Sequence, residues 1–352
     1  MIIHPPLLTF QDGSPVMPST WPQRRAELLD ILQREQYGYV PAPPQSVRGE
    51  ILRTDLSCCA GHARLEQLRI AFDTPRGEFA FPMHFFCPTD GKRHPLFILL
   101  SFSESAYTAS YPAEEIIDNG FALAVIPYTA VTSDDPDMTN GLSGCYPRES
   151  SSAWGKLAMW GWAASRAADY LLTRPEVDGK NIAVIGHSRL GKAALVCGAL
   201  DERFRFTFAN DSGCGGDALE RGKRPDSESI PGMHRMFPHW LCDNCSHLPE
   251  DPEDRPLDQH FLMGAIAPRF VAVCGAQEDQ WADPYGGQRC CAASSEAWEL
   301  LGLPGYIGPR EPAKAGDAFL EGSVGYALRD GIHFLSRQDW LVYMRFMKAH
   351  LK

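Results

Sequence analysis

The sequence predicts an α/β fold, with a mostly parallel central sheet, helices on both faces and an N-terminal antiparallel extension. From about residue 95 onward, short apolar runs alternate with segments of helical periodicity. Parallel strands joined by helical crossovers produce this alternation. Before Pro95, three strand-like segments follow one another with only turn signals between them, which indicates antiparallel pairing. We therefore expect a single domain, in which an arm, a helix and strands in 1–94 join a core of 95–352.

Composition narrows the classes of partner. The chain has 352 residues, of which 44% are hydrophobic, enough for a large core. Its net charge of −11 argues against nucleic acid and anionic membranes as partners, and no apolar run approaches the roughly 18 residues that span a bilayer. The N-terminus lacks the basic and apolar regions of a signal peptide, and the 11 scattered cysteines fit reduced thiols. These features predict a cytoplasmic protein; they leave its oligomeric state open.

The N-terminal region divides at its prolines and turn residues. We expect residues 1–22, which are rich in proline, to form an extended arm. Residues 23–36 have amphipathic spacing and end before a proline cluster, which predicts a helix. Alternating apolar residues and the turn signals around Gly77 and Gly91 predict three strands, at 49–56, 66–73 and 79–87.

In the core, continuous apolar runs predict buried strands, and longer periodic segments predict the helices between them. The expected strands are 96–100, 122–126, 182–185, 204–209, 269–274 and 323–328. The expected helices are 113–119, 154–172 (ending before Pro175), one starting near 192, 257–267, 287–301 and 338–351. Residues 177–181 are expected to form a turn, and 217–255 a polar excursion.

The stretch Ile182 to Lys192, IAVIGHSRLGK, places a serine on a sharp turn between a buried strand and a helix. Such a turn holds a serine at the carboxyl edge of the sheet, in front of helix N–H groups that can stabilise an oxyanion. The usual pattern is G-x-S-x-G, whereas here Leu190 replaces the second glycine and Gly191 follows it. We interpret Ser188 as a nucleophile; the alternative is a serine that only caps the helix.

A serine nucleophile needs a base, and the base needs an acid that orients it. In α/β-hydrolase folds these residues follow the serine in the order acid, then histidine, in loops after strands. His333 follows the last expected strand and occupies the expected place of the base. The acid is either Asp279, after the penultimate strand, or Asp211, one strand earlier. The weaker candidates are Asp283 and Asp258, and Asp258 is better explained as a helix cap.

A metal-dependent alternative rests on Cys242, Cys245 and His247. Their spacing resembles half of a zinc site, but no second ligand pair follows at a suitable distance. We therefore expect neither a metal nor a cofactor.

Several motifs together resemble the glucuronoyl esterases, carbohydrate esterase family 15. Gly186 to Lys192 resembles the family motif G-C-S-R-x-G-K, with His187 in place of the cysteine. Asn210 to Gly216 is similar to its E-S-G-x-G-G stretch, with Asp211 in place of the glutamate. Glu278 to Pro284 resembles its D-x-W-x-x-P region, and Phe237 to Trp240 its aromatic segment. The resemblance covers about residues 95–352.

The resemblance implies a serine esterase with the α/β-hydrolase fold. It implies Ser188 as nucleophile, His333 as base, and an acid at the position of Asp211 or Asp279. It also implies that Arg189 stabilises the oxyanion and that three residues contact the sugar: Lys192, Trp281 and Trp240.

The expected substrate is a small-molecule or oligosaccharide ester, most simply a uronic acid ester that reacts through an acyl-enzyme. Two alternatives stay open at this point. Related bacterial sequences are often described as acetyl xylan esterases, so the enzyme could remove O-acetyl groups. A carbohydrate-binding homologue without catalysis is the other alternative.

Overall fold

The fold is built on one ten-stranded sheet with the order β1-β2-β3-β5-β4-β6-β7-β8-β10-β9. The structure, a computed structural model, describes residues 4–351. The strands are β1 Val47–Asp55, β2 Ala63–Thr74, β3 Gly77–Pro88, β4 His94–Ser101, β5 Ala122–Pro127, β6 Val177–His187, β7 Phe206–Asn210, β8 Phe270–Ala276, β9 Ala318–Phe319 and β10 Val324–Arg329.

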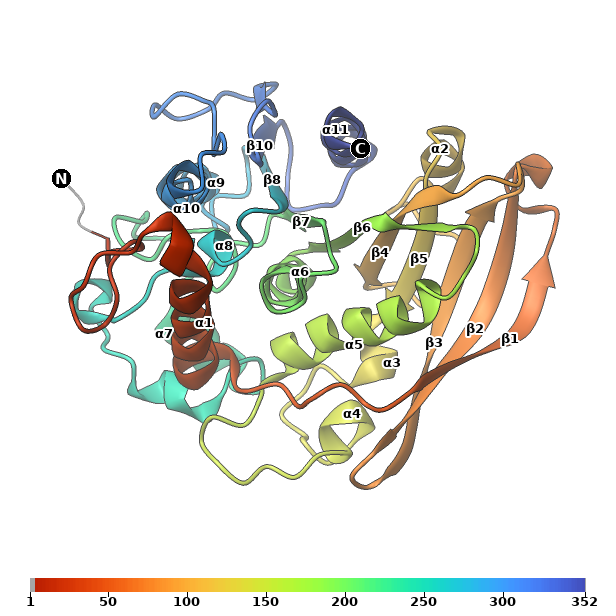
Figure 1. The fold of residues 1–352 in the computed structure, drawn as a ribbon, viewed down its shortest axis with the longest axis horizontal. Helices are drawn as coiled ribbons and strands as arrows, with labels where there is room; N and C mark the ends of the chain where they lie inside the picture. Colours follow the sequence, from red (N-terminus) through yellow and green to blue (C-terminus); the bar gives the residue numbers. More distant parts are fainter. Residues whose placement is uncertain (1–3, 352) are drawn as a thin grey trace.

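The central strands β5, β4, β6, β7, β8 and β10 are all parallel to their neighbours in this part of the sheet. β1, β2 and β3 form an antiparallel extension, and β3 joins the rest of the sheet by pairing antiparallel with β5. The predicted α/β fold and its N-terminal antiparallel extension are therefore confirmed. Strands from the predicted N-terminal region and from the predicted core pair within one continuous sheet (Figure 1).

Helices cover both faces of the sheet. The longer ones are α1 Trp21–Leu32, α5 Lys156–Leu171, α6 Arg189–Leu200, α9 Pro284–Ser294 and α11 Arg337–His350; the shorter ones are α2 Ala113–Asp118, α3 Tyr128–Val131, α4 Gly141–Gly144, α7 Ile230–Met236, α8 His260–Gly264 and α10 Glu296–Leu300. In Figure 1, α5 and α6 lie on one face, while α2 and α11 lie on the other. Each face has its own apolar core, and the buried strands supply side chains to both.

The N-terminal region packs against the core. The arm forms a short bridge between Thr9 and Pro15, and its Leu7 is buried. α1 begins two residues before the expected helix, because Pro22 is compatible with the first turn. It passes at Gln33 into a short π-helical segment that ends at Tyr37.

Four further differences from the sequence prediction have local causes. Residues 177–181 belong to β6: Val177 pairs with His94, and the register shifts before Leu96. Asp178 accepts hydrogen bonds from Lys180 N–H and the Asn181 side-chain amide. These local bonds, which are typical of turns, form here within an irregular part of β6. β9 is an extra edge strand of only two residues, too short for periodicity to reveal.

The other two differences concern helices. The expected helix at 257–267 shrinks to α8, because the Asp258 carboxylate binds the main-chain N–H groups of Glu220, Arg221 and Gln259. The expected helix at 287–301 starts earlier, at Pro284, and divides into α9 and α10 at Ser295, whose hydroxyl bonds back to the Cys291 carbonyl.

Among residues 4–351 no helix combines the length and apolar character required to cross a membrane. The cytoplasmic location stays a prediction.

Candidate active site

The predicted site residues converge at one edge of the sheet, where the parallel strands end. Ser188 follows β6, Asp211 follows β7, Asp279 lies three residues beyond β8, and His333 lies four residues beyond β10. The carboxyl ends of parallel strands share one edge, so residues more than a hundred positions apart in sequence become neighbours.

Ser188 occupies a strained turn between β6 and α6. Its φ of 56° and ψ of −129° are rare for a residue with a side chain, and the α6 backbone begins directly after it. The turn is tight enough that a Cβ atom on Gly186 would lie 2.0 Å from the Leu190 carbonyl oxygen. Gly191 lies close to the loop after β7, since a Cβ atom added at Gly191 would lie 2.9 Å from the Ser212 side chain. The second glycine of the motif, displaced by one residue, thus allows α6 to pack closely against Ser212.

His333 and Asp279 form a direct contact. The His333 Nδ1 atom lies 2.6 Å from Asp279 Oδ2, and the imidazole is 42% exposed while the carboxylate is nearly buried. The loops that carry them are joined by a hydrogen bond from Glu278 N–H to the Gly331 carbonyl oxygen at 3.0 Å. An Nδ1–H bonded to a carboxylate leaves Nε2 free to accept a proton, which is the tautomer a general base requires.

Asp211 lies beside this pair and differs from Asp279 in its environment. One ligating atom from each of Asp211, Asp279 and His333 lies within 4.8 Å of the others. Asp211 Oδ1 accepts a hydrogen bond from Ala276 N–H at 2.7 Å, while Oδ2 has no hydrogen-bond partner among residues 4–351. Burial, and then the charge of Asp279, raise the pKa of Asp211 to about 8. The neutral carboxylic acid is therefore the main form of Asp211 at neutral pH.

His187, which replaces the family's cysteine, packs against the predicted base. The ring centroids of His187 and His333 are 4.4 Å apart. His187 Nδ1 lies 2.7 Å from Asn210 Oδ1, and the Asn210 amide group donates to the Cys274 carbonyl, so His187 is the donor of the first bond. Burial, and then the neighbouring His333, lower the pKa of His187 to about 4. A neutral ring therefore lies next to the predicted base.

Arg189 reaches back over the turn, where its guanidinium is held by an ion pair with Asp134. The guanidinium carbon lies 4.7 Å from the centre of the Trp240 ring. Trp240 is only 2% exposed, stacks on Phe237 at 4.0 Å, and donates its indole N–H to Asp134 at 2.7 Å. Trp240 is therefore placed where it supports Arg189, and its predicted contact with the sugar stays a prediction.

Lys192 is also buried rather than exposed to a substrate. Its Nζ donates to the carbonyl oxygens of Ser212, at 2.7 Å, and Cys214, and to the Glu228 carboxylate at 2.6 Å. These three acceptors match the three protons of the ammonium group. The structure places Lys192 as a support for the loop after β7, so direct contact with a sugar would require one acceptor to be displaced.

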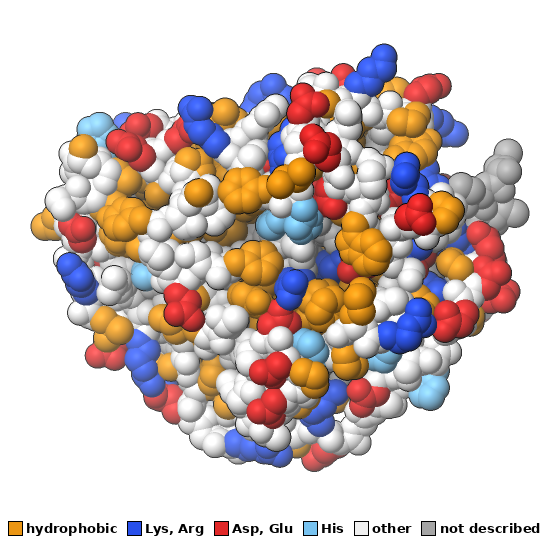
Figure 2. All heavy atoms as spheres, turned by 180° about the vertical axis from the view of Figure 1, so that it is seen from behind, with side chains coloured by type: hydrophobic (Ala, Val, Ile, Leu, Met, Phe, Trp, Pro, Cys, Tyr) orange, Lys and Arg blue, Asp and Glu red, His pale blue; other side chains and the backbone are white. Residues whose placement is uncertain are grey.

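Exposed apolar side chains surround the predicted base. Ile332 and Phe334, which flank His333, are 66% and 44% exposed, and Phe102 makes an edge contact with His187. Trp281 is 52% exposed and can offer a ring face to a sugar. In Figure 2 hydrophobic side chains gather around histidine atoms near the centre of the face shown.

Arg329 is a site residue that the sequence analysis missed. Its guanidinium donates to the Asp330, Ile332 and Phe334 carbonyl oxygens, and so shapes the loop around His333. Its Nη2 also lies 3.5 Å from Asp211 Oδ2. An arginine at a strand end has no motif of its own, and only its position just before the His333 loop could have suggested this role.

Metal binding by Cys242, Cys245 and His247 is not supported by their placement. Both thiols are buried, and burial raises the pKa of Cys242 to about 11 and that of Cys245 to about 12, which disfavours thiolate ligands. Within residues 4–351 these side chains do not form a cluster with metal-ligand spacing.

Comparison with known proteins identifies a family resemblance over most of the chain. A sequence model described as glucuronyl esterase of fungi matches residues 80–302, which is more than half of the chain. The carbohydrate esterase MZ0003 from an unknown prokaryotic organism is 30% identical over 99% of this chain and 89% of its own length. The 4-O-methyl-glucuronoyl methylesterase of Phanerochaete carnosa is 28% identical over 84% of this chain and 71% of its own length.

Solved structures extend the likeness to the whole fold. The glucuronoyl esterase from Solibacter usitatus is 30% identical, with a TM-score of 0.91 over 100% of this chain and 98% of its own. A family 15 glucuronoyl esterase from Teredinibacter turnerae is 27% identical, with a TM-score of 0.88 over 98% of this chain and 88% of its own.

Proposed function

Because the chain belongs to the glucuronoyl esterase family, carbohydrate esterase family 15, we propose that it hydrolyses uronic acid esters with Ser188 as its nucleophile. It is a carboxylic ester hydrolase with the α/β-hydrolase fold. The observation that supports this mechanism most strongly is the 2.6 Å contact between His333 and Asp279, at the sheet edge where the Ser188 turn lies.

In the proposed reaction the Ser188 hydroxyl oxygen attacks the ester carbonyl carbon as its proton moves to Nε2 of His333. The Asp279 carboxylate holds the opposite ring nitrogen and offsets the charge of the imidazolium. The tetrahedral intermediate collapses, the C–O bond of the ester breaks, and the alcohol leaves with the proton from His333. A water molecule then repeats these steps on the acyl-enzyme and releases the acid.

Two features suit the negative charge that develops on the carbonyl oxygen. The first N–H groups of α6 point toward the serine turn, where orphan donors of a helix N-terminus favour an oxyanion. Arg189 adds a cation held by Asp134 and Trp240. A charge that interacts more strongly with the transition state than with the neutral ester raises kcat.

The substrate class follows from the relatives. Relatives of this chain are named 4-O-methyl-glucuronoyl methylesterases, and we assign the same class of ester here. Trp281 is an exposed ring on which the sugar would stack, and its carbonyl oxygen accepts a hydrogen bond from the Glu228 main-chain N–H.

The test compares wild type, Ser188→Ala and the control Ser46→Ala on methyl glucuronate. We expect Ser188→Ala to lose at least about a thousandfold in kcat, because no other group replaces the nucleophile. Ser46 is exposed and precedes β1, which four other strands separate from β6 in the sheet, so its variant should keep wild-type turnover. Turnover by Ser188→Ala at the wild-type rate would contradict the proposal.

A second assay separates the alternatives that the sequence left open. A fluorophosphonate probe reacts only with an activated serine, so labelling of wild type but not of Ser188→Ala argues against a non-catalytic binding protein. Hydrolysis of acetylated xylose without hydrolysis of methyl glucuronate would replace the uronate assignment with an acetyl esterase that uses the same residues.

A further inference from the structure

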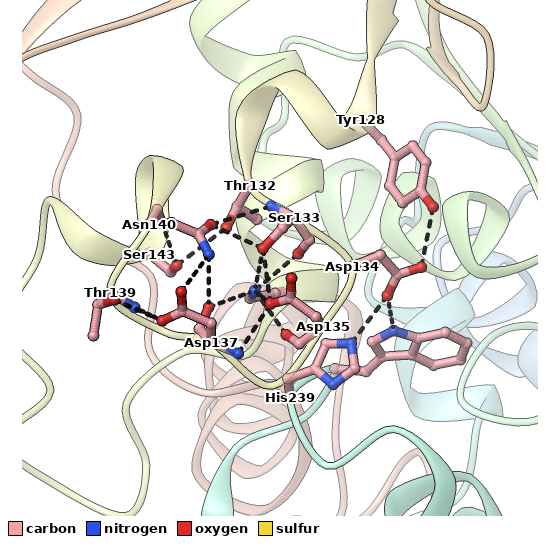
Figure 3. Close-up of polar contacts among 12 residues, drawn as sticks. Tyr128, Thr132, Ser133, Asp134, Asp135, Asp137, Thr139, Asn140, Ser143 and His239 are labelled. Carbon is pink, nitrogen blue, oxygen red and sulfur yellow. Dashed lines mark hydrogen bonds and ion pairs between the residues drawn. The ribbon is translucent and has the colours of Figure 1, made fainter.

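The loop between α3 and α4 is wrapped around a buried ammonium group. Lys156, the first residue of α5, is fully buried. Its Nζ donates to the carbonyl oxygens of Ser133, Asp135 and Asp137, each at 2.8 Å. Figure 3 shows Ser133, Asp135 and Asp137, the loop residues that supply these carbonyl oxygens, gathered close together. A shell of carbonyl oxygens resembles the environment of a bound metal cation, but here the cation is part of the chain.

Side chains of the loop fix its conformation further. The Asp137 carboxylate accepts from the Thr139 main-chain N–H at 2.8 Å, the Thr139 hydroxyl at 2.6 Å and the Asn140 amide at 2.8 Å. The Ser133 hydroxyl donates to the Asn140 amide oxygen at 2.8 Å. Because these side-chain bonds and the three bonds of the ammonium group can all form in the same conformation, they favour that conformation of the loop.

The same helix end holds a second segment. Lys156 N–H donates to the His239 carbonyl at 2.8 Å, and Leu157 N–H donates to the Trp240 carbonyl at 3.2 Å. Gly155 permits this approach, because a Cβ there would lie 2.3 Å from the Trp240 carbonyl oxygen. The start of α5 therefore fixes both the loop that contains Asp134 and the segment that contains Trp240.

Asp134 lies between these two segments and points away from the Lys156 shell toward His239 and Tyr128 (Figure 3). Oδ1 accepts from His239 Nε2 at 3.0 Å and from the Trp240 indole at 2.7 Å. Oδ2 accepts from the Tyr128 hydroxyl at 3.1 Å and pairs with Arg189. Burial favours the neutral acid, but these donors outweigh it, and the pKa of Asp134 lies well below its usual range.

Arg189 is therefore confined on two sides. Asp134 binds one end of its guanidinium, and the rings of Trp240, Phe237 and Phe102 lie 4.7, 5.5 and 5.7 Å from the guanidinium carbon. A long, flexible side chain contributes to an oxyanion site only if it is held in place before the reaction, because ordering it during the reaction costs entropy.

We propose that Asp134 is a positioning residue for Arg189, and that Lys156 is the built-in cation that fixes Asp134. This inference rests on the proposed ester hydrolysis, in which Arg189 faces the oxyanion. Neither residue touches the reacting atoms: Lys156 orders the loop, the loop places Asp134, and Asp134 orients the guanidinium next to Ser188.

The first experiment is a double-mutant cycle between Asp134→Asn and Arg189→Met, with kcat and KM measured on methyl glucuronate. Asparagine keeps an oxygen for the Trp240 and His239 donors but loses the ion pair. We expect Asp134→Asn alone to lower kcat about tenfold while KM changes by less than about twofold. In the Arg189→Met background, itself about a hundredfold slower, the same change should alter kcat less than about twofold.

Asp118→Asn is the matched control. Asp118 is an exposed aspartate that also pairs with a basic side chain, His62, on the surface. Its variant should keep wild-type kcat and KM. An equal loss from Asp134→Asn in both Arg189 backgrounds would overturn the proposal, because Asp134 would then act through the general stability of the site.

The second arm tests Lys156. Lys156→Met should lower kcat in the wild-type background but add less than about twofold in the Asp134→Asn background; additive losses would overturn its assigned role. If that variant does not fold, Asn140→Ala loosens the loop that Lys156 orders, because it removes the side-chain amide that bonds to Ser133 and Asp137. It should lower kcat about threefold in the wild-type background and leave it unchanged in the Asp134→Asn background. Additive losses from Asn140→Ala would overturn the role assigned to Lys156 and its loop.

The rate of fluorophosphonate labelling is measured in every background, because it reports the activated serine without requiring a sugar ester. Labelling that follows the same cycle while methyl glucuronate is not hydrolysed would contradict the uronate assignment and support the positioning role. Hydrolysis of methyl glucuronate with additive losses in the cycle would support the uronate assignment and contradict the positioning role of Asp134.

Discussion

At the scale of single residues, the site contains two aspartate side chains with different contacts. Asp279 contacts His333 directly, whereas Asp211 accepts a main-chain N–H and retains its proton at neutral pH. Only the first arrangement supplies a charge that orients the imidazole and stabilises its protonated form. The sequence left both candidates open because each follows a strand at the same sheet edge, and their difference arises from the groups that each side chain contacts in the folded protein.

We therefore predict that Asp279→Asn lowers kcat about a hundredfold or more, whereas Asp211→Asn lowers it less than about tenfold. The neutral amide in Asp279→Asn cannot balance the charge on His333, while the amide oxygen in Asp211→Asn can still accept from Ala276 N–H. Steady-state kinetics on methyl glucuronate would measure both, with Asp211→Asn as the isosteric control. Equal and small losses would mean that either acid can replace the other.

Asp211 also gives a prediction about pH and stability. Its pKa is about 8 in the folded protein and near 3.9 in an unfolded chain. Between these values the folded state holds a proton that the unfolded state has lost, so this group makes the wild type less stable as pH rises from about 4 to 8. Asp211→Asn cannot titrate, and we expect its stability relative to wild type to increase by about 2–5 kcal/mol across that window.

Denaturant unfolding of both proteins at pH 5 and pH 8 would measure this difference. A difference in unfolding free energy that is independent of pH would contradict the raised pKa of Asp211. Other titrating groups are common to both proteins and cancel in the comparison.

At the scale of elements, the turn from β6 to α6 determines where the serine lies. Its motif was recognisable from sequence because the tight turn leaves no room for a side chain at Gly186, and Ser188 has a backbone conformation that few residues adopt. The burial of Lys192 and Trp240 was not recognisable in the same way. Lys192 carries a charge, which usually keeps a side chain exposed, and Trp240 belongs to the 217–255 excursion. Contacts with Ser212, Cys214 and Glu228 hold Lys192 inside, and packing against the start of α5 holds Trp240 inside.

We predict that Gly186→Ala destabilises the protein by more than about 3 kcal/mol or prevents folding, because its methyl group would overlap the Leu190 carbonyl. Gly287→Ala in α9 is the matched control. Its added Cβ would lie no closer than 3.4 Å to a neighbouring atom, and alanine favours a helix over glycine by up to about 1 kcal/mol. Thermal unfolding of the two variants should therefore change in opposite directions.

At the scale of the whole molecule, hydrogen bonds between residues far apart in the sequence join the N-terminal region to the core. The Tyr37 hydroxyl donates to the Gly215 carbonyl at 2.8 Å, and Arg25 donates to the Ala265 carbonyl at 2.7 Å. Alternation of strands and helices revealed the sheet, but it could not show these contacts. They join the π-helical segment after α1 to the loop after β7, and α1 to the end of α8. The boundary at residue 95 marks a change of pattern within a continuous sheet.

We therefore predict one cooperative unfolding transition for the whole chain. Leu28 of α1 is fully buried, and Leu28→Ala should lower the free energy of unfolding by about 2–5 kcal/mol while leaving a single transition. Leu195→Ala, in α6 of the core, serves for comparison and should behave alike. Tryptophan fluorescence and circular dichroism should follow the same curve, and two separated transitions would contradict the single-domain prediction.

The ammonium group of Lys156 holds the loop between α3 and α4 in place whatever ions the solution contains. A dissolved ion held by the same oxygens would leave whenever its concentration fell or a chelator competed for it. A tethered side chain is present at an unchanging local concentration and arrives with the polypeptide during synthesis. The arrangement of side chains next to Ser188 is thereby made independent of metal ions dissolved in the medium.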